Sequence, residues 1–226
     1  MSNLTIPLTF LLILNYSAVL VPSQSIIPSR YDGFVYRKRA ASTSTVLIEA
    51  FYDPVCPDSR DSWPPLKQAV DHYSPSLVSL IVHTFPLPLV QLLSRSICCI
   101  IFMVIAILFY IDRVCLLTNK QERFYNAQTL NMSREAVLDQ VIGFASSALG
   151  NSMQSAIKSG FSDSKTGTKT RVSFKYGCSR GVYGTPFFFV NGFLLPVSDD
   201  IIDYDGWRKI IDPLTNKQQH YPLNVF

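Results

Sequence analysis

The sequence has few charged residues and few histidines for its length. Only 16% of its 226 residues are charged, against about a quarter in soluble domains, while 48% are hydrophobic. Its net charge of +4 comes without a dense basic run beyond Arg37-Lys38-Arg39, so no nucleic-acid partner is expected. The three histidines, His72, His83 and His220, lack zinc-site spacing, so no metal site is expected either. Disorder and fibrous structure are excluded by the apolar content, and the length fits one domain.

Cysteine is also scarce, with five residues in the chain. That number is too small for a scaffold held by disulfides, and because it is odd it leaves at least one thiol unpaired. Cys98, Cys99 and Cys115 are expected to behave as small hydrophobic residues. Cys178 is expected to be a structural thiol, with a distant resolving partner for Cys56 as the alternative.

Residues 1–25 contain no Lys, Arg, Asp or Glu and include the apolar stretches Ile6–Leu14 and Ala18–Val21. This pattern predicts a signal peptide, although it lacks a basic start; an uncleaved anchor or a buried helix are the alternatives. A signal peptide implies the secretory pathway, either the endoplasmic reticulum lumen or the extracellular space. Asn131 then becomes a candidate glycosylation site, on a weak three-residue signal.

A second apolar stretch, Ile97–Ile111, has no polar face and lies between Arg95 and Asp112. The sixteen residues between Arg95 and Asp112 would form a helix about 24 Å long, short of a hydrocarbon core of about 30 Å. Three interpretations stay open on this segment alone: a membrane span, with association through residues 96–117, a buried helix, or an anomalous piece of sequence.

The segment with the clearest chemistry surrounds Cys56. Residues 46–52 predict a strand, and a helix is expected from Pro57 to about Tyr73. The unpaired N–H groups and the dipole of a helix N-terminus stabilise a thiolate at Cys56. Ser59 completes a C-x-x-S motif, so a hydroxyl stands where a dithiol motif has its second sulfur. A serine can donate a hydrogen bond to the thiolate, but it cannot attack a mixed disulfide.

A second motif lies far along the chain. Asn191-Gly192 separates two apolar runs and is a strong hairpin signal, and Thr185-Pro186 immediately before it is a place for a cis prolyl bond. Ser133 begins a pattern typical of an amphipathic helix. Residues 162–169 are expected to form a surface loop, and His83 is expected to be a core or solvated histidine rather than one that faces the active site.

Taken in order, these motifs resemble the thioredoxin superfamily, and most of all its DsbA-like branch. The resemblance implies an α/β thioredoxin-like fold with a helical insertion between the second and third core strands. The single domain would cover residues 26–226. Its core would comprise about 46–88 and 170–212, with a strand at 77–85 and a closing helix at 204–212, and the insertion would occupy about 89–169.

The same resemblance implies roles for the motif residues. Cys56 would be the nucleophile and Ser59 would occupy the resolving position, while Pro57, Thr185 and Pro186 would contact the substrate. A monothiol implies an isomerase or a glutathione-linked oxidoreductase, with glutathione as co-substrate and no resident cofactor. Its partners would be cysteine-containing or extended polypeptides.

Two other functions stay open. The chain could be a non-catalytic peptide-binding module of the secretory pathway, or a glutathione-conjugating relative that uses Ser59. The fold also bears on the second apolar stretch, because a single span there would put Cys56 and Pro186 on opposite sides of the membrane. We therefore expect a buried helix, or a non-native segment such as a retained intron or a mis-joined gene model, rather than a span.

Overall fold

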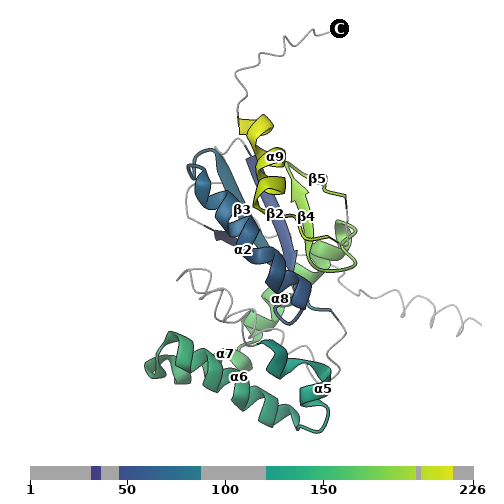
Figure 1. The fold of residues 1–226 in the computed structure, drawn as a ribbon. Helices are drawn as coiled ribbons and strands as arrows, with labels where there is room; N and C mark the ends of the chain where they lie inside the picture. The colour runs from purple at the N-terminus through teal and green to yellow at the C-terminus, as the bar shows by residue number, and fades with distance from the viewer. Residues whose placement is uncertain (1–31, 37–45, 88–120, 197–199, 216–226) are drawn as a thin grey trace, which may run out of the picture. The chain divides into compact units, whose positions relative to one another are not determined.

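A mixed five-stranded sheet forms the centre of the described part of the chain (Figure 1). The computed structural model describes residues 32–36, 46–87, 121–196 and 200–215. The strand order is β1-β3-β2-β4-β5, in which β2 and β3 pair in parallel and the other neighbours pair antiparallel. The strands are β1 (Phe34–Tyr36), β2 (Val46–Tyr52), β3 (Val78–Thr84), β4 (Phe187–Val190) and β5 (Phe193–Leu194).

The two central strands are buried almost along their whole length, as expected for parallel strands with helices on both faces. They pair from Val46 with Val78 through to Tyr52 with Thr84. Helix α2 (Pro57–His72) connects them. The strands and the helix predicted from the sequence around Cys56 are therefore confirmed, whereas β1 was not anticipated.

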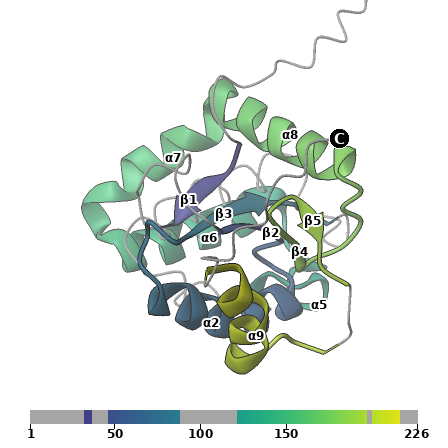
Figure 2. The ribbon, with the colours of Figure 1, turned by 90° about the horizontal axis from the view of Figure 1, so that it is seen from above.

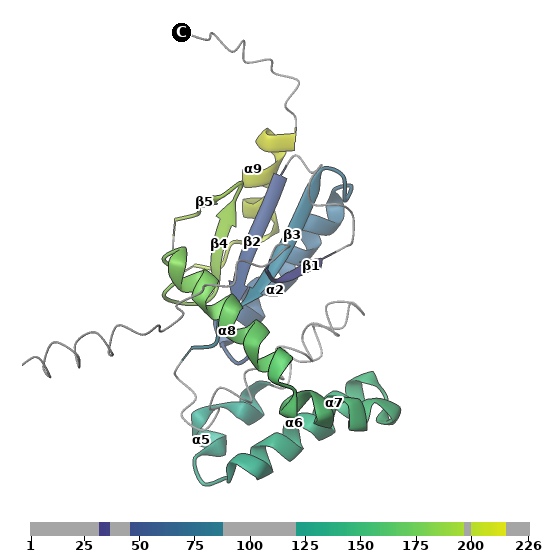
Figure 3. The same ribbon diagram turned by 180° about the vertical axis from the view of Figure 1, so that it is seen from behind.

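Helices cover the two faces of the sheet (Figures 2 and 3). Helices α2 and α9 (Tyr204–Thr215) lie on one face, and α8 (Ser164–Ser179) lies on the other. Side chains alternate along β2, so Ile48 and Ala50 pack into the core cluster that contains Trp207 of α9, while Phe51 packs with Phe85 on the opposite face. The closing helix is confirmed and extends three residues beyond its predicted end.

Between β3 and β4 the described chain is helical. Helix α6 begins at its N-cap Ser133, whose hydroxyl accepts a hydrogen bond from the N–H of Ala136 at 3.2 Å. Its apolar residues Val137 and Val141 join the main core cluster, so the predicted amphipathic helix is confirmed. The elements of this segment are η1 (Gln121–Phe124), α5 (Asn126–Thr129), α6 (Arg134–Leu149), η2 (Asn151–Met153), α7 (Gln154–Ser162) and α8.

The prediction of a surface loop at residues 162–169 is wrong. Helix α8 begins at Ser164 and runs through this stretch, and Asp163 caps it by accepting a hydrogen bond from the N–H of Lys165 at 3.0 Å. The cap and the packing of the later turns of α8 on the sheet outweigh the low helix propensity of Gly and Thr in this stretch.

The predicted hairpin is confirmed between β4 and β5. Asn191 has φ 50° and Gly192 has φ 83°, the left-handed conformations that a two-residue hairpin turn requires. Asn191 also pairs with Leu47 of β2, since its N–H donates to the Leu47 carbonyl and its side-chain oxygen accepts from the Leu47 N–H, both at 2.8 Å. The turn is therefore anchored to the central strand.

Among the residues that the structure describes, no helix is long and apolar enough to cross a membrane. The second apolar stretch (97–111), the wider segment 96–117 and the predicted signal peptide (1–25) lie outside those residues.

Candidate active site

Cys56 is the N-cap residue of α2, at the junction with the loop that follows β2. Its backbone is extended, with φ −84° and ψ 125°, and Pro57 occupies the first turn, where the absence of an N–H costs nothing. The residue is half-buried and its thiol is free. The side chain thus lies at the N-terminal, positive end of a 16-residue helix.

The cis-proline loop is the second part of the site. The Thr185–Pro186 bond is cis, and the Cys56 Sγ donates a hydrogen bond to the Thr185 carbonyl at 3.3 Å. Both Thr185 and Pro186 are half-buried, and β4 begins at the next residue. The fold therefore brings together two motifs that are 129 positions apart in the sequence.

Ser59 lies in the first turn of α2 but does not hydrogen-bond to Cys56 in the described structure. It is only 5% exposed, and its hydroxyl accepts a hydrogen bond from the N–H of Asp53 at 3.3 Å. Its carbonyl accepts from the hydroxyl of Ser62 at 3.1 Å. Ser59 thus stabilises the turn that precedes Cys56.

Asp53 is a site residue that the sequence reasoning missed. Its carboxylate accepts hydrogen bonds from the N–H groups of Val55 at 3.0 Å and Leu87 at 2.7 Å, and its carbonyl accepts from the N–H of Cys56 at 3.1 Å. Burial raises the pKa of Asp53 to about 6, although these two N–H bonds to the carboxylate oppose the rise. An Asp-Pro pair before the cysteine is a turn signal that could have revealed this role.

His83 and Cys178 also carry groups that could take part in chemistry. His83 is buried and stacks on Phe51 with ring centroids 4.5 Å apart, so of the two expected places, core or solvent, it takes the core. Cys178 is exposed near the end of α8, so its expected role as a structural thiol is wrong. No group of residues that could hold a metal ion is found in the described ranges.

Beside the cis-proline loop, the geometry provides a half-buried free sulfur, that of Cys56, which can act as a nucleophile. The Thr185 carbonyl accepts a hydrogen bond from this thiol, and the N-terminus of α2 lies beside it. Ser59, in the last position of the C-x-x-S motif, carries a hydroxyl and no sulfur, so an intramolecular disulfide between Cys56 and this position is excluded. Any covalent intermediate on Cys56 must therefore be released by another thiol.

Comparison with known proteins bears on the fold. No protein-family model matches the sequence, and no curated protein matches it. Among solved structures, Wolbachia pipientis α-DsbA1 has a TM-score of 0.59 at 16% identity, covering 85% of this chain and 94% of that one. The oxidoreductase NmDsbA1 from N. meningitidis has a TM-score of 0.57 at 12% identity, covering 83% and 93%. Pseudomonas aeruginosa DsbA2 has a TM-score of 0.54 at 16% identity, covering 85% and 100%.

At such low identities the likeness concerns the arrangement of the chain. The sheet, the helix that follows Cys56 and the helical segment between β3 and β4 correspond to the architecture expected from the sequence motifs. The chain therefore has the DsbA-like form of the thioredoxin fold.

Proposed function

We propose that this protein carries out thiol–disulfide exchange through Cys56. The observation that supports the proposal most directly is the contact between the Cys56 Sγ and the Thr185 carbonyl, beside the N-terminus of α2. A half-buried free thiol in that environment is favoured as a nucleophile.

In the proposed reaction, the Cys56 thiolate attacks one sulfur of a substrate disulfide. The electron pair of the broken S–S bond leaves with the other sulfur, which takes up a proton, and a mixed disulfide with Cys56 remains. A second thiolate then attacks this mixed disulfide, and Cys56 leaves as a thiolate. The cycle returns Cys56 to its starting state.

Ser59 decides the kind of exchange, because it cannot supply that second thiolate. The release can come from another cysteine of the substrate, which rearranges disulfides without net oxidation, or from glutathione acting as co-substrate. Substrates would be cysteine-containing or extended polypeptides. They would lie beside Pro57, Thr185 and Pro186, which adjoin the thiol or its hydrogen-bond acceptor.

A peptide with a mixed disulfide to glutathione provides the test. Cys56 would take the glutathione and release the peptide thiol, and a second glutathione would then remove the first as oxidised glutathione. We expect peptide release in the presence of glutathione, its loss in Cys56→Ala, and its retention in Cys178→Ala. A Cys56→Ala protein as active as the unchanged chain would refute the proposal.

The alternative is a non-catalytic peptide-binding module, and the hydrogen bond between Ser59 and Asp53 favours it, since Ser59 there has a structural use. Peptide binding without glutathione-dependent turnover, unchanged in Cys56→Ala, would support this alternative. Saturable glutathione binding that survives Cys56→Ala and is lost in Ser59→Ala would instead indicate glutathione conjugation.

We also propose a secretory location, on the basis of residues 1–25 in the sequence. Asn131 is exposed in the turn between α5 and α6. Sequencing the N-terminus of the expressed protein, with a peptide map that covers residues 89–120 and Asn131, tests removal of the signal, presence of the apolar stretch and glycosylation.

A further inference from the structure

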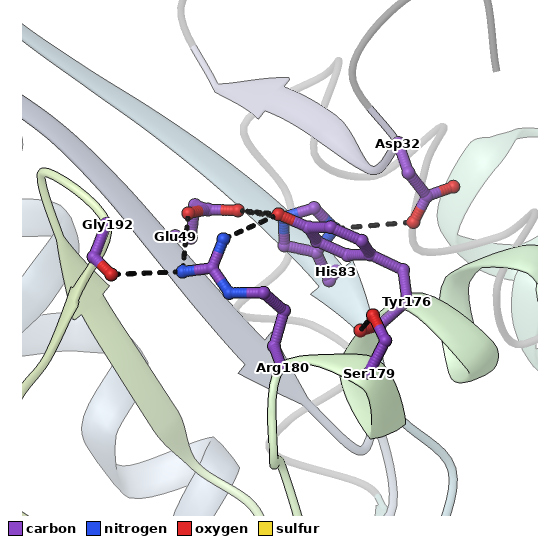
Figure 4. A network of polar contacts seen from close by, with 7 residues as sticks. All are labelled: Asp32, Glu49, His83, Tyr176, Ser179, Arg180 and Gly192. Atoms are coloured by element: carbon purple, nitrogen blue, oxygen red, sulfur yellow. Dashed lines mark hydrogen bonds and ion pairs between the residues drawn. The ribbon is translucent and has the colours of Figure 1, made fainter. Parts of the chain in front are cut away.

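A buried polar cluster lies between the sheet and α8, on the face opposite α2 (Figure 4). Glu49 of β2 and His83 of β3 are only 4% and 1% exposed. Ionised side chains are costly to bury unless they are paired, so the partners of these two residues define what the cluster does. Its members, called the Glu49 cluster below, are Asp32, Glu49, His83, Tyr176 and Arg180.

Glu49 is the centre of the cluster. Its Oε1 accepts a hydrogen bond from the Tyr176 hydroxyl at 2.6 Å and lies 3.4 Å from His83 Nε2. Its Oε2 lies 3.6 Å from Arg180 Nη2. Burial by itself would raise the pKa of Glu49, but the nearby His83, the hydrogen bond from Tyr176 and the charge of Arg180 outweigh burial and lower it. The carboxylate is therefore held in its ionised form.

His83 joins the two acids of the cluster, because its Nδ1 lies 3.3 Å from Asp32 Oδ2 on the side away from Glu49. Burial would lower the pKa of His83, but Asp32 and Glu49 outweigh it and raise the pKa. When His83 is protonated, two positive groups face two carboxylates. The buried charges are then balanced.

Arg180 connects the Glu49 cluster to the hairpin turn and to β4. It donates hydrogen bonds from Nη1 to the Tyr176 hydroxyl at 3.1 Å and from Nη2 to the Gly192 carbonyl at 3.2 Å. Its guanidinium also lies 4.3 Å from the centre of the Phe189 ring. One side chain thus links the end of α8, the hairpin turn and β4.

Residues 181–186 carry the cis proline and begin directly after Arg180. Val182 is buried, and its N–H donates to the Gly177 carbonyl of α8 at 3.0 Å. Pro186 follows four residues later, and β4 begins directly after it. The other end of β4 leads into the hairpin turn, where Arg180 donates to the Gly192 carbonyl. Residues 181–186 are therefore attached at both ends to elements that Arg180 joins.

We propose that Arg180 is a positioning residue that holds residues 181–186 in place and so keeps the Thr185 carbonyl against the Cys56 Sγ. Glu49 contacts Tyr176 of α8, and Phe51 packs in the cluster on that face of the sheet. Cys56 instead precedes α2, which lies on the other face, so the Glu49 cluster acts through the intervening segment. This inference rests on Cys56 being the reactive thiol of the proposed function.

The test is the rate at which iodoacetamide alkylates Cys56 in Arg180→Met. The hydrogen bond to the Thr185 carbonyl holds the Cys56 Sγ against the loop, so loosening the loop should increase access of the reagent to the sulfur. Because a net hydrogen bond is modest, we expect alkylation about threefold to tenfold faster than in the unchanged protein. Cys56 is the single cysteine of the tryptic peptide 40–60, so its alkylation is measured separately from that of Cys178.

Arg208→Met is the matched control. Arg208 pairs with Asp212 at 3.0 Å and lies 5.3 Å from the Tyr73 ring centre, so its loss removes the same kinds of contact on α9. This control should keep the unchanged rate, even where its free energy of unfolding falls as much as that of Arg180→Met. A change in stability alone is thereby separated from a change at the thiol.

Arg180→Lys provides a second variant if Arg180→Met does not fold, because it keeps the charge beside Glu49 but loses the planar, multiple donors. It should alkylate faster than the unchanged protein and more slowly than Arg180→Met. Unchanged Cys56 alkylation in the folded Arg180 variants would overturn the positioning role. Iodoacetamide needs no disulfide substrate, so faster alkylation in a protein without exchange activity would reject the proposed function and leave the positioning role intact.

Discussion

The hydroxyl of Ser59 accepts a hydrogen bond from the backbone N–H of Asp53 at 3.3 Å. The residue in the last position of the C-x-x-S motif therefore stabilises the loop that leads to Cys56. The same position, in the first turn of α2, is where a second sulfur would have to lie to reach Cys56. A substitution at Ser59 therefore tests the geometry of the motif directly.

Ser59→Cys should form a disulfide with Cys56 in oxidising buffer. The two residues lie one helical turn apart, and the buried hydroxyl is replaced by a sulfur of similar shape, at a cost of about 1 kcal/mol for the weakened hydrogen bond to Asp53. Both cysteines would fall in the tryptic peptide 40–60, so the disulfide appears as the loss of two hydrogen atoms from its mass.

The control for this experiment is Ser62→Cys. Ser62 is also buried in α2 but lies one turn further from Cys56, so its sulfur should not form the bond. Equal cross-linking in the two variants, or none in Ser59→Cys, would contradict the thioredoxin-like geometry of the motif.

Asp53→Asn should change how stability depends on pH. The folded pKa of Asp53 is raised from 3.8 to about 6, so the contribution of Asp53 is fully present below pH 3.8 and is lost as the pH rises through about 6. Asparagine has no such loss, although it gives up one of the two acceptor oxygens at every pH. Urea denaturation should show the stability deficit of the variant shrinking by about 2 kcal/mol between pH 4 and pH 7.

Asp71→Asn is the comparison for that measurement. Asp71 lies at the exposed end of α2, where its carboxylate pairs with Lys67 at 2.7 Å. We expect this variant to keep the pH dependence attributed to Asp53. A constant difference between Asp53→Asn and the unchanged protein across the same pH range would show that Asp53 does not titrate near 6.

Gly177→Ala should destabilise the packing of α8 on the sheet. A Cβ at this position would lie 2.6 Å from Cδ2 of Phe85 and 3.3 Å from Phe51, both of them buried aromatic rings. Overpacking of this kind costs about 1–3 kcal/mol, measured as the loss in free energy of unfolding in urea.

Gly143→Ala is the matched helix substitution, because a Cβ there meets nothing within 4 Å. It should stabilise α6 by about 0.5–1 kcal/mol through the lower backbone entropy of alanine. Equal effects of the two substitutions would mean that α8 does not approach the sheet as closely as the structure has it.

His83→Gln should remove a stability change at higher pH. The folded pKa of His83 lies above 6.5, so its contribution is fully present below pH 6.5 and is lost as the pH rises through the folded value. The unchanged protein should therefore lose more stability across that window than the variant does, since both keep the contribution of Asp53. His72→Gln, on the exposed end of α2, is the control and should behave like the unchanged protein.

Much of the site was predictable because its motifs are local. Pro57 and Ser59 belong to a short helix start, and Asn191-Gly192 specifies its own turn through left-handed backbone angles. Thr185-Pro186 lies immediately before a strand, and this local order of residues is one of the motifs that resemble the thioredoxin superfamily. These features depend on a few neighbouring residues, so they can be found without knowing what the chain folds against.

The Glu49 cluster could not be found in this way. Glu49 and His83 look like ordinary polar residues in two apolar strands, and they become neighbours only because β2 pairs with β3 in parallel. Arg180 reaches Glu49 and Gly192 only after α8 has packed on the sheet. The carboxylate of Asp53 likewise accepts a hydrogen bond from the N–H of Leu87, a residue that lies beside it only because β3 pairs with β2.

The sequence by itself determined the strand and helix around Cys56 and the hairpin, since hydrophobic periodicity and turn chemistry act over short distances. The resemblance of its motifs to the thioredoxin superfamily implied the α/β class and the order of the elements. Tertiary structure decided the strand order, the helical state of residues 164–169, and which polar groups are buried together. The reason is physical: the protonation state of a buried acid or histidine depends on which groups the fold places within a few ångströms of it, however far apart they are along the chain.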